Sequence, residues 1–331
     1  MKKKIERYFI SGLCLLMLLL FLKYPAICTK LAGEGLTNWY RTIIPCLFPF
    51  MVLTSILHEL QLETTIEKFF HPLLLCFRSA SSYGKYCILI GLLCGFPMGA
   101  KIIAEHCQNG MLSKKEAQFL LPLCNQLSPA FCIGVIYPLA ASLLPYHALL
   151  MTFLLMYAVP LFYGIILRKQ YDSGSCSLIN TFGSEQNEQV SIPKALDNSL
   201  TKNILPIIKI GSYMIIFRVC SCVPQLLIPM LKNIFSANTL LQHLIPLFQM
   251  NISMGLEITT GILQINTLKD FSPIILALSL FYHIHLGGIS CIMQTYAFIE
   301  GSGLSIFRYC KVKLLFGMID CIILSIYFII F

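Results

Sequence analysis

Long apolar runs separated by short polar stretches make up most of this 331-residue chain. A run of about 20 apolar residues can cross the ~30 Å hydrocarbon core of a bilayer as an α-helix, and the chain lacks the short, evenly spaced alternating strands of a membrane barrel. The pattern therefore predicts an all-α polytopic membrane protein with about nine hydrophobic segments. These segments cover residues 8–22, 42–60, 86–105, 117–140, 145–167, 204–231, 240–265, 272–298 and 309–331.

The first apolar run follows a basic flank and resembles a signal sequence. The flank extends from Lys2 to Arg7, and the apolar run covers residues 8–22. No A-x-A cleavage pattern follows in residues 23–30. We therefore expect residues 1–34 to form an uncleaved anchor helix.

One long polar stretch divides the chain. Residues 168–203 are rich in Ser, Asn, Gln and Glu, and because this composition cannot bury a core, a flexible linker is predicted. The flanking segments, 35–167 and 204–331, share one order of features: a Pro-containing helix, a Gly-interrupted segment, a segment interrupted at mid-depth and a plain helix. This shared order favours an internal duplication into two repeats.

The distribution of Lys and Arg does not decide the orientation in the membrane. When every segment is treated as a simple crossing, the basic residues divide almost evenly between the two sides, so the positive-inside rule gives no preference. A near tie is expected if some interrupted segments are re-entrant hairpins. The two halves would then be inverted copies.

Composition excludes a soluble protein and disfavours nucleic acid as a partner. Only 12% of the residues are charged, and the mean hydropathy is +0.77. The net charge of +9 comes from 24 Lys and Arg residues spread along the whole chain, which is typical of membrane-protein loops. The expected surroundings are the lipid bilayer of a cell membrane, and the sequence leaves a homo-oligomer open.

No motif for catalysis, metal binding or a cofactor is present in the sequence. The 15 cysteines form no C-x-x-C pair and match no metal-ligand spacing, so they are interpreted as small apolar residues. The patterns G-x-x-x-x-G-K-[ST], H-E-x-x-H and G-x-S-x-G are also missing. We expect no enzymatic activity, no cofactor and no ATP-driven transport within this chain.

Interrupted helices mark the candidate binding site. In hydrocarbon, breakers such as Gly95, Pro97 and Gly99 are tolerated only where protein or a water-filled cavity receives the freed backbone groups. Corresponding breaks in two halves therefore predict a site near the bilayer midplane. A half-helix starting near Gly99 would direct its positive dipole end at an anion, with Lys101 just beyond. Kinks that serve only packing are the alternative.

Ionisable residues inside apolar segments are further candidates. Glu257, followed by Thr259, could carry a coupling proton or coordinate a cation, or it could form a structural ion pair with Lys209, Arg218 or Lys101. A self-satisfying pair of Lys101 with Glu105, at helical i,i+4 spacing, is the alternative to a substrate role for this lysine.

Polar groups at the breaks complete the predicted site. Amides and hydroxyls there would orient a polar ligand, although amides also join helices by hydrogen bonds. His283 and His285 are too close in sequence to share one helix face, so one proton-handling histidine is favoured over a metal pair. Asp320 is expected to pack or to form a salt bridge with another helix. The candidate binding residues at the breaks are Asn125, Ser128, Gly287, Gly288 and Ser290.

Five motifs in order resemble a known family. They are Gly-Phe-Pro-Met-Gly-Ala-Lys (95–101), Gly-Met-Leu-Ser (110–113), Cys-Asn-Gln-Leu-Ser-Pro (124–129), Gly-Leu-Glu-Ile-Thr (255–259) and Gly-Ser-Gly-Leu-Ser (301–305). Together they resemble the YlbJ (SpoVV) family of sporulation integral membrane proteins, within the wider group that carries the nucleoside-recognition (Gate) domain. The resemblance extends from about residue 35 to residue 331.

The resemblance implies a transporter of two Gate-type repeats, similar in plan to concentrative nucleoside carriers. It implies a role in endospore formation, moving dipicolinic acid from the mother cell across the outer forespore membrane. Dipicolinate is a small aromatic dianion, which agrees with a break that presents a helix N-terminus beside Lys101. Two alternatives stay open: a carrier of nucleosides or other neutral metabolites, and a non-transporting membrane component of spore assembly.

Overall fold

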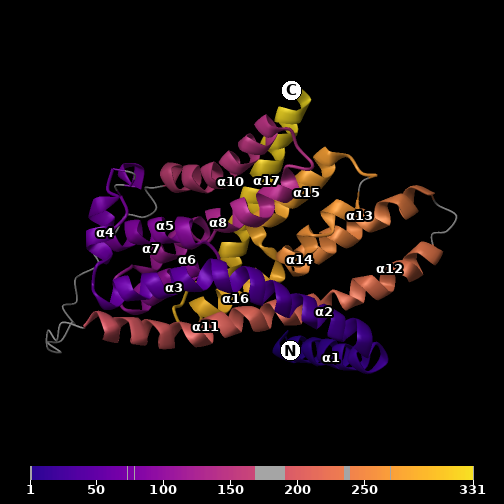
Figure 1. Ribbon diagram of the computed structural model, residues 1–331, viewed down its shortest axis with the longest axis horizontal. Helices are drawn as coiled ribbons and strands as arrows, with labels where there is room; N and C mark the ends of the chain where they lie inside the picture. Colours follow the sequence, from indigo (N-terminus) through magenta and orange to yellow (C-terminus); the bar gives the residue numbers. More distant parts are fainter. Residues whose placement is uncertain are drawn as a thin grey trace.

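The computed structural model describes residues 2–72, 74–77, 79–167, 191–234, 239–268 and 270–330, and every regular element in these ranges is a helix or helical turn (Figure 1). This confirms the all-α fold. Within the described part of the chain, six stretches are long and apolar enough to cross a membrane. They are Pro25–Glu59, Lys114–Ala140, Tyr146–Ile166, Ile192–Ile234, Pro273–Ile299 and Ile306–Ile330. The expected count of nine is not confirmed, since some apolar runs form only short helices.

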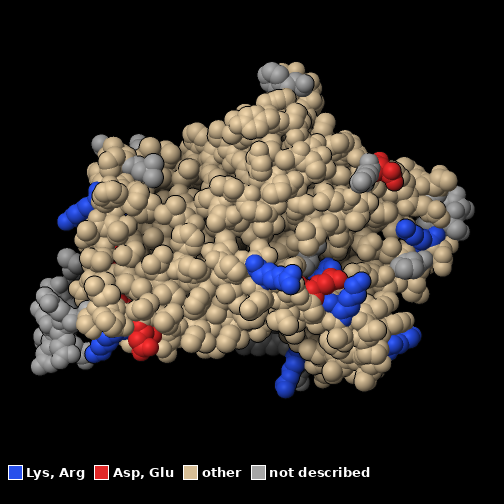
Figure 2. All heavy atoms as spheres, in the orientation of Figure 1, with Lys and Arg blue, Asp and Glu red and all other residues tan. Residues whose placement is uncertain are grey.

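The exposed surface is apolar to an extent that water would not tolerate. On α10 (Tyr146–Ile166), Leu150, Leu154 and Phe162 are 54%, 58% and 61% exposed. Figure 2 shows that the surface over α10, α15 (Pro273–Leu286) and α17 (Ile306–Ile330) is almost free of charged side chains. A continuous apolar surface of this kind faces lipid, so the chain is an integral membrane protein.

A pair of long helices runs along one side of the molecule (Figure 1). After α1 (Lys2–Lys23), α2 (Pro25–Asn38), a π-helical turn (Trp39–Ile43) and α3 (Ile44–Glu59) form one extended span. It packs along α11 (Ile192–Cys220), which continues into α12 (Cys222–Ile234). The two spans can meet closely because Gly211 has no side chain. A Cβ at this position would lie 2.5 Å from the Trp39 ring. The same indole donates a hydrogen bond to the Ile207 carbonyl at 3.0 Å.

The predicted linker falls partly outside the described residues. Residues 168–190 are not described, whereas residues 192–203 form the first part of α11. This helix starts there because Ser191 is extended and a proline occupies its first turn. Ala195, Ser199 and Asn203 repeat every four residues and are fully buried, so this polar stretch has one face that packs on the protein.

The first interrupted segment is a helical hairpin. A short α4 (Glu63–Phe69) and a 3-10 turn (Leu75–Phe77) lead into α5 (Ser82–Cys94), and α6 (Met98–Gln108) follows after three residues. The arms are antiparallel, because His106 at the end of α6 packs edge to face against Tyr83 at the start of α5, with ring centroids 5.4 Å apart. At about 1.5 Å per residue both arms are too short to cross the bilayer.

An interrupted helix follows the hairpin. Helix α7 (Lys114–Cys124) ends at residues 125–128, which are not helical. The chain then resumes as a helix over α8 (Pro129–Phe131), a π-helical turn (Cys132–Ile136) and α9 (Tyr137–Ala140). The new start is stabilised by the Ser128 hydroxyl, which accepts a hydrogen bond from the Phe131 N–H at 3.2 Å.

The same order of elements occurs after α12. Helix α13 (Thr239–Leu256) turns at Glu257 into the short α14 (Ile258–Ile262), which folds back on it. After a 3-10 turn (Ile265–Thr267), α15 ends at Gly287 and α16 (Gly288–Ile299) begins. The uninterrupted helices α10 and α17 close the two series. Each series thus contains a hairpin, an interrupted helix and a plain helix.

Glycines allow each hairpin to touch the interrupted helix by backbone. A Cβ on Gly99 would lie 2.0 Å from the Cys124 carbonyl oxygen, and one on Gly95 would lie 2.4 Å from the Ser128 nitrogen. In the second series, a Cβ on Gly288 would lie 2.7 Å from the carbonyl oxygen of Met254. No other residue type permits these approaches.

Replacing Gly99 with Ala is expected to destabilise the protein by about 1–3 kcal/mol, because the methyl group would overlap the Cys124 carbonyl. The melting temperature in detergent, followed with a thiol-reactive dye that detects buried cysteines, should therefore fall by several degrees. Gly134→Ala is the matched control, since nothing lies within 4 Å of its Cβ position. Equal melting temperatures for both variants would contradict this close backbone packing.

Candidate functional site

A small cavity lies where the hairpin turns and the interrupted helices meet. Its volume is about 60 Å³. The polar residues that line it are Ser128 at the first break, Glu257 and Thr259 at the second hairpin turn and Gln294 on α16, and Phe96 and Pro97 line it at the first hairpin turn. Helices α3 and α11 close it with apolar side chains. Of the predicted site residues, Pro97, Ser128, Glu257 and Thr259 are therefore brought together in this central cavity.

Glu257 is held in place by the turn on which it lies. It is 2% exposed, and its Oε1 accepts hydrogen bonds from the Thr259 N–H at 3.0 Å and the Thr259 hydroxyl at 2.6 Å. The carboxylate thus caps the start of α14 while it lines the cavity. Arg218, one of the ion-pair partners weighed from the sequence, pairs with Glu34, with Nη2 and Oε2 2.5 Å apart.

The other glycines and polar groups at the second break shape the backbone. Gly287 and Gly288 have φ angles of +72° and +76°, a region that residues with a Cβ rarely adopt. Ser290, fully buried at the start of α16, accepts a hydrogen bond from the Gln294 amide at 3.1 Å. Through this bond Ser290 orients Gln294. Gln294 lines the central cavity, whereas Ser290 does not.

Asn125 connects the first break to the second half. It is fully buried, and its amide nitrogen donates to the Thr295 hydroxyl at 2.9 Å and the Tyr309 hydroxyl at 3.0 Å. Asn125 does not line the central cavity. Its position fits the alternative weighed from the sequence, in which an amide joins helices.

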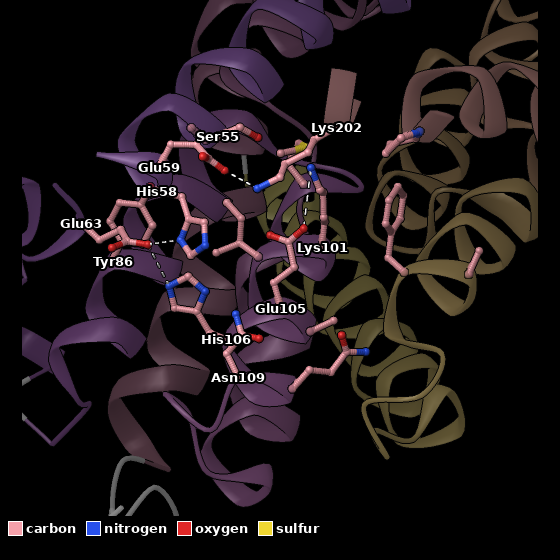
Figure 3. Close-up of a pocket in the computed structure, with 18 of the residues that line it drawn as sticks. Ser55, His58, Glu59, Glu63, Tyr86, Lys101, Glu105, His106, Asn109 and Lys202 are labelled. Carbon is pink, nitrogen blue, oxygen red and sulfur yellow. Dashed lines mark hydrogen bonds and ion pairs between the residues drawn. The ribbon is translucent and has the colours of Figure 1, made fainter. Parts of the chain in front are cut away.

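Lys101 lines a second, larger cavity, which we call the vestibule and which has a volume of about 510 Å³ (Figure 3). Its Nζ donates a hydrogen bond to Asn203 Oδ1 at 2.6 Å and lies 3.8 Å from Glu105 Oε1. The i,i+4 pair predicted for Lys101 and Glu105 is therefore present, but the closer partner comes from α11. Lys202 also lines the vestibule and is paired with Glu59.

The vestibule ends one helical turn from the central cavity. Along α6, Pro97 lines the central cavity and Met98 lines the vestibule. Along α16, Gln294 lines the central cavity and Ala297 lines the vestibule. A small cavity of about 70 Å³ that touches both Gln294 and Ala297 lies between them. The two cavities are therefore neighbours along α16.

The vestibule also contains two histidines and a glutamate. His58 Nδ1 lies 2.5 Å from Glu63 Oε1, and His106 Nε2 lies 3.7 Å from the same oxygen. Figure 3 shows both rings directed at this carboxylate. Burial lowers the pKa of His106 to about 4, so its ring is neutral at pH 7. This cluster is not evident from the sequence, because its members lie on three separate elements.

Two buried ionisable groups on α17 were not identified as site residues from the sequence. Lys313 is fully buried and contacts residues 125 and 126 of the first break. Asp320 is 1% exposed, and its Oδ2 lies 2.5 Å from Nε2 of His285 on α15. The expected contact of Asp320 with another helix is thus present, as a hydrogen bond with His285. The signal in the sequence was the spacing of Lys313, Gly317, Asp320 and Leu324 along one helix face.

Comparison with known proteins shows that part of this chain is similar in sequence to one curated protein. It is 24% identical over 133 residues to the sporulation integral membrane protein YlbJ of Bacillus subtilis (strain 168). The match covers 40% of this chain and 33% of the relative, so the matched region spans about a third of that protein. No family model matches the chain, and no solved structure matches it. The match supports a family-level relationship between this integral membrane protein and YlbJ.

Proposed function

We propose that this protein is a secondary carrier of a small organic anion, with dipicolinate as the first candidate, in a membrane of a spore-forming bacterium. The relative named for sporulation supports the biological setting, and the motif resemblance supports the cargo. As part of the same proposal, residues 35–167 and 204–331 are two Gate-type repeats. The outer forespore membrane is the proposed location.

One observation carries the transport proposal: the central cavity lies where two hairpin turns, the first helix break and α16 meet. Such discontinuous helices expose backbone groups and dipole ends at the middle of carriers, where they hold the substrate. They cost stability in a protein that serves only as an anchor. A non-transporting role is therefore the weaker interpretation of this arrangement.

Lys101 and the vestibule favour an anion as cargo. The lysine is 8% exposed, and its only carboxylate partner within 4.0 Å among the described residues, Glu105, has a side chain that is 46% exposed. A carboxylate of the cargo can replace this weak, solvated pair. The ligand would then be adjacent to the positive end of α6, which is directed at the first hairpin turn.

The central cavity supports a second candidate, a carrier of nucleosides or other neutral polar metabolites. Its polar lining comprises the Glu257 carboxylate, the Gln294 amide and the hydroxyls of Ser128 and Thr259, with no Lys or Arg. Amide and carboxylate groups of this kind form hydrogen bonds to the ring edges and hydroxyls of neutral ligands. The anion candidate thus depends on the vestibule, and the neutral candidate depends on the central cavity.

Lys101→Ala is expected to reduce the initial uptake of labelled dipicolinate into proteoliposomes at least tenfold. Loss of a charge-assisted contact is worth roughly 1.5–3 kcal/mol, and about 1.4 kcal/mol corresponds to a factor of ten. Lys30→Ala, which changes an exposed lysine that lines neither cavity, should transport normally. Normal uptake by correctly inserted Lys101→Ala protein would refute the anion assignment at this residue.

Glu257→Gln tests whether the buried carboxylate carries a coupling proton. If it does, an imposed pH gradient accelerates uptake by the unmodified protein, and the acceleration disappears in the variant while uptake without a gradient persists. Asp197→Asn, at an exposed position on α11, is the control and should keep the response. If the pH gradient changes the uptake rate of neither the unmodified protein nor the two variants, the protein is a facilitator instead.

Competition separates the two cargo classes. Excess unlabelled dipicolinate should reduce binding of labelled dipicolinate to the purified protein, and excess uridine or adenosine should leave it unchanged. The opposite pattern, in which a labelled nucleoside binds and dipicolinate does not compete, would replace the first candidate with the second. Equilibrium binding is the appropriate measurement because it does not depend on a coupling gradient.

A further inference from the structure

Lys313 lies at the first helix break, where its nitrogen contacts two oxygen atoms and an aromatic ring. Its side chain is completely buried. The Nζ atom is 2.9 Å from the Asn125 carbonyl oxygen, 2.7 Å from Gln126 Oε1 and 4.7 Å from the centre of the Phe96 ring. The lysine thus joins α17 to both the break and the tip of the first hairpin.

All three neighbours are suited to a positive charge. An ammonium group has three N–H donors and no acceptor, and at this break it meets two oxygen acceptors and the negative face of an aromatic ring. The amide hydrogens of the same residues point elsewhere: Asn125 donates to Thr295, and Gln126 Nε2 donates to the Pro122 carbonyl at 2.6 Å. The site therefore offers electron pairs to Lys313 and no donor.

No acidic residue balances this charge directly. Across the described residues, no Asp or Glu oxygen lies within 4.0 Å of the Lys313 nitrogen. Asp320, two turns along α17, is engaged with His285. The nitrogen instead contacts carbonyl and amide oxygens, which are the ligands that proteins offer to a desolvated inorganic cation.

Unwound helix segments in carriers commonly use backbone carbonyls to coordinate a coupling cation. The break at residues 125–128 has this chemistry, and the hairpin covers it through a hydrogen bond from the Phe96 N–H to the Gln126 carbonyl at 2.6 Å. Another oxygen, Asn125 Oδ1, is buried and has no hydrogen-bond partner among the described atoms. This oxygen belongs to the same residue whose backbone carbonyl accepts from Lys313.

We propose that the Lys313 ammonium is a tethered cation that permanently occupies an oxygen-lined cation site at the first helix break. It takes the place that a free monovalent cation holds in an ion-coupled carrier. The charge keeps the hairpin tip closed on the break, and no inorganic cation is needed there. Removing the side chain opens a cage that Na⁺ or a small amine can fill.

This inference does not depend on the cargo. Its test therefore measures cation binding, through the melting temperature, rather than uptake. The full-length protein in detergent is heated in NaCl, in choline chloride of equal ionic strength and in choline chloride with methylammonium. The unmodified protein should melt at one temperature in all three. Lys313→Ala should melt lower in choline and gain about 5–10 °C with saturating Na⁺ or methylammonium, as expected for a ligand well above its Kd.

Two variants serve as controls. Lys313→Met removes the charge but fills the space, so Na⁺ should not stabilise it. Lys101→Ala removes the buried lysine of the vestibule, whose partners are Asn203 and Glu105, and it should show no cation-specific shift. A Na⁺ response in either control would assign the effect to general salt stabilisation and overturn the proposal.

The remaining outcomes are also decisive. A Na⁺-specific shift in the unmodified protein would mean that a free cation already binds there, against the proposal. If the Lys313→Ala protein folds but no cation raises its melting temperature, Lys313 serves only packing and the proposal is wrong. If this variant can be purified only in NaCl or methylammonium, the proposal is supported, and if it can be purified in none of the three solutions, the proposal fails.

Discussion

Backbone polar groups inside hydrocarbon need partners, and this requirement controls the architecture. Each hairpin turn and each break in the two series frees N–H and C=O groups near the middle of the bundle. Close backbone packing satisfies part of them, as in the hydrogen bond from the Phe96 N–H to the Gln126 carbonyl. The approach is possible because Gly95 and Gly99 lack a Cβ where the neighbouring chain passes within 2.4 and 2.0 Å of that position.

The same requirement extends to charge. Arg218 lies against Glu34, and His285 lies against Asp320, so each of these buried groups has a partner of opposite charge or a strong hydrogen bond. Lys313 is stabilised differently, by oxygen dipoles of the unwound segment and an aromatic face. Since an isolated charge in the bilayer costs several kcal/mol, these contacts are conditions for folding as much as features of a site.

The two cavities differ in size and in the charge of their walls. The vestibule has charged walls and a volume of about 510 Å³, whereas the central cavity, at about 60 Å³, is too small for an organic anion. Room for an organic anion at the centre therefore requires the hairpins to move away from the breaks. The glycine contacts and the Lys313 bridge are the interactions that such a movement must release, which links the packing of this fold to the proposed transport cycle.

The amino-acid sequence alone was sufficient for the fold class and for the positions of the interruptions. Apolar length determines a membrane helix, and Gly and Pro interrupt it wherever the fold places them, so Gly95, Pro97 and Gly287 could be identified without coordinates. The number of crossings could not, because an apolar run of 13 residues such as α5 becomes a re-entrant arm only through its packing against α6 and α7.

The composition of the site was decided by tertiary structure. Lys101 follows the first break directly in sequence, yet it faces the vestibule and Asn203, whereas Lys313, far along the chain, reaches the break itself. Helix register explains the difference: one residue turns a side chain by about 100°, and only the neighbouring helices determine which direction is the interior. Local sequence therefore located the breaks, and long-range packing chose the charges that meet there.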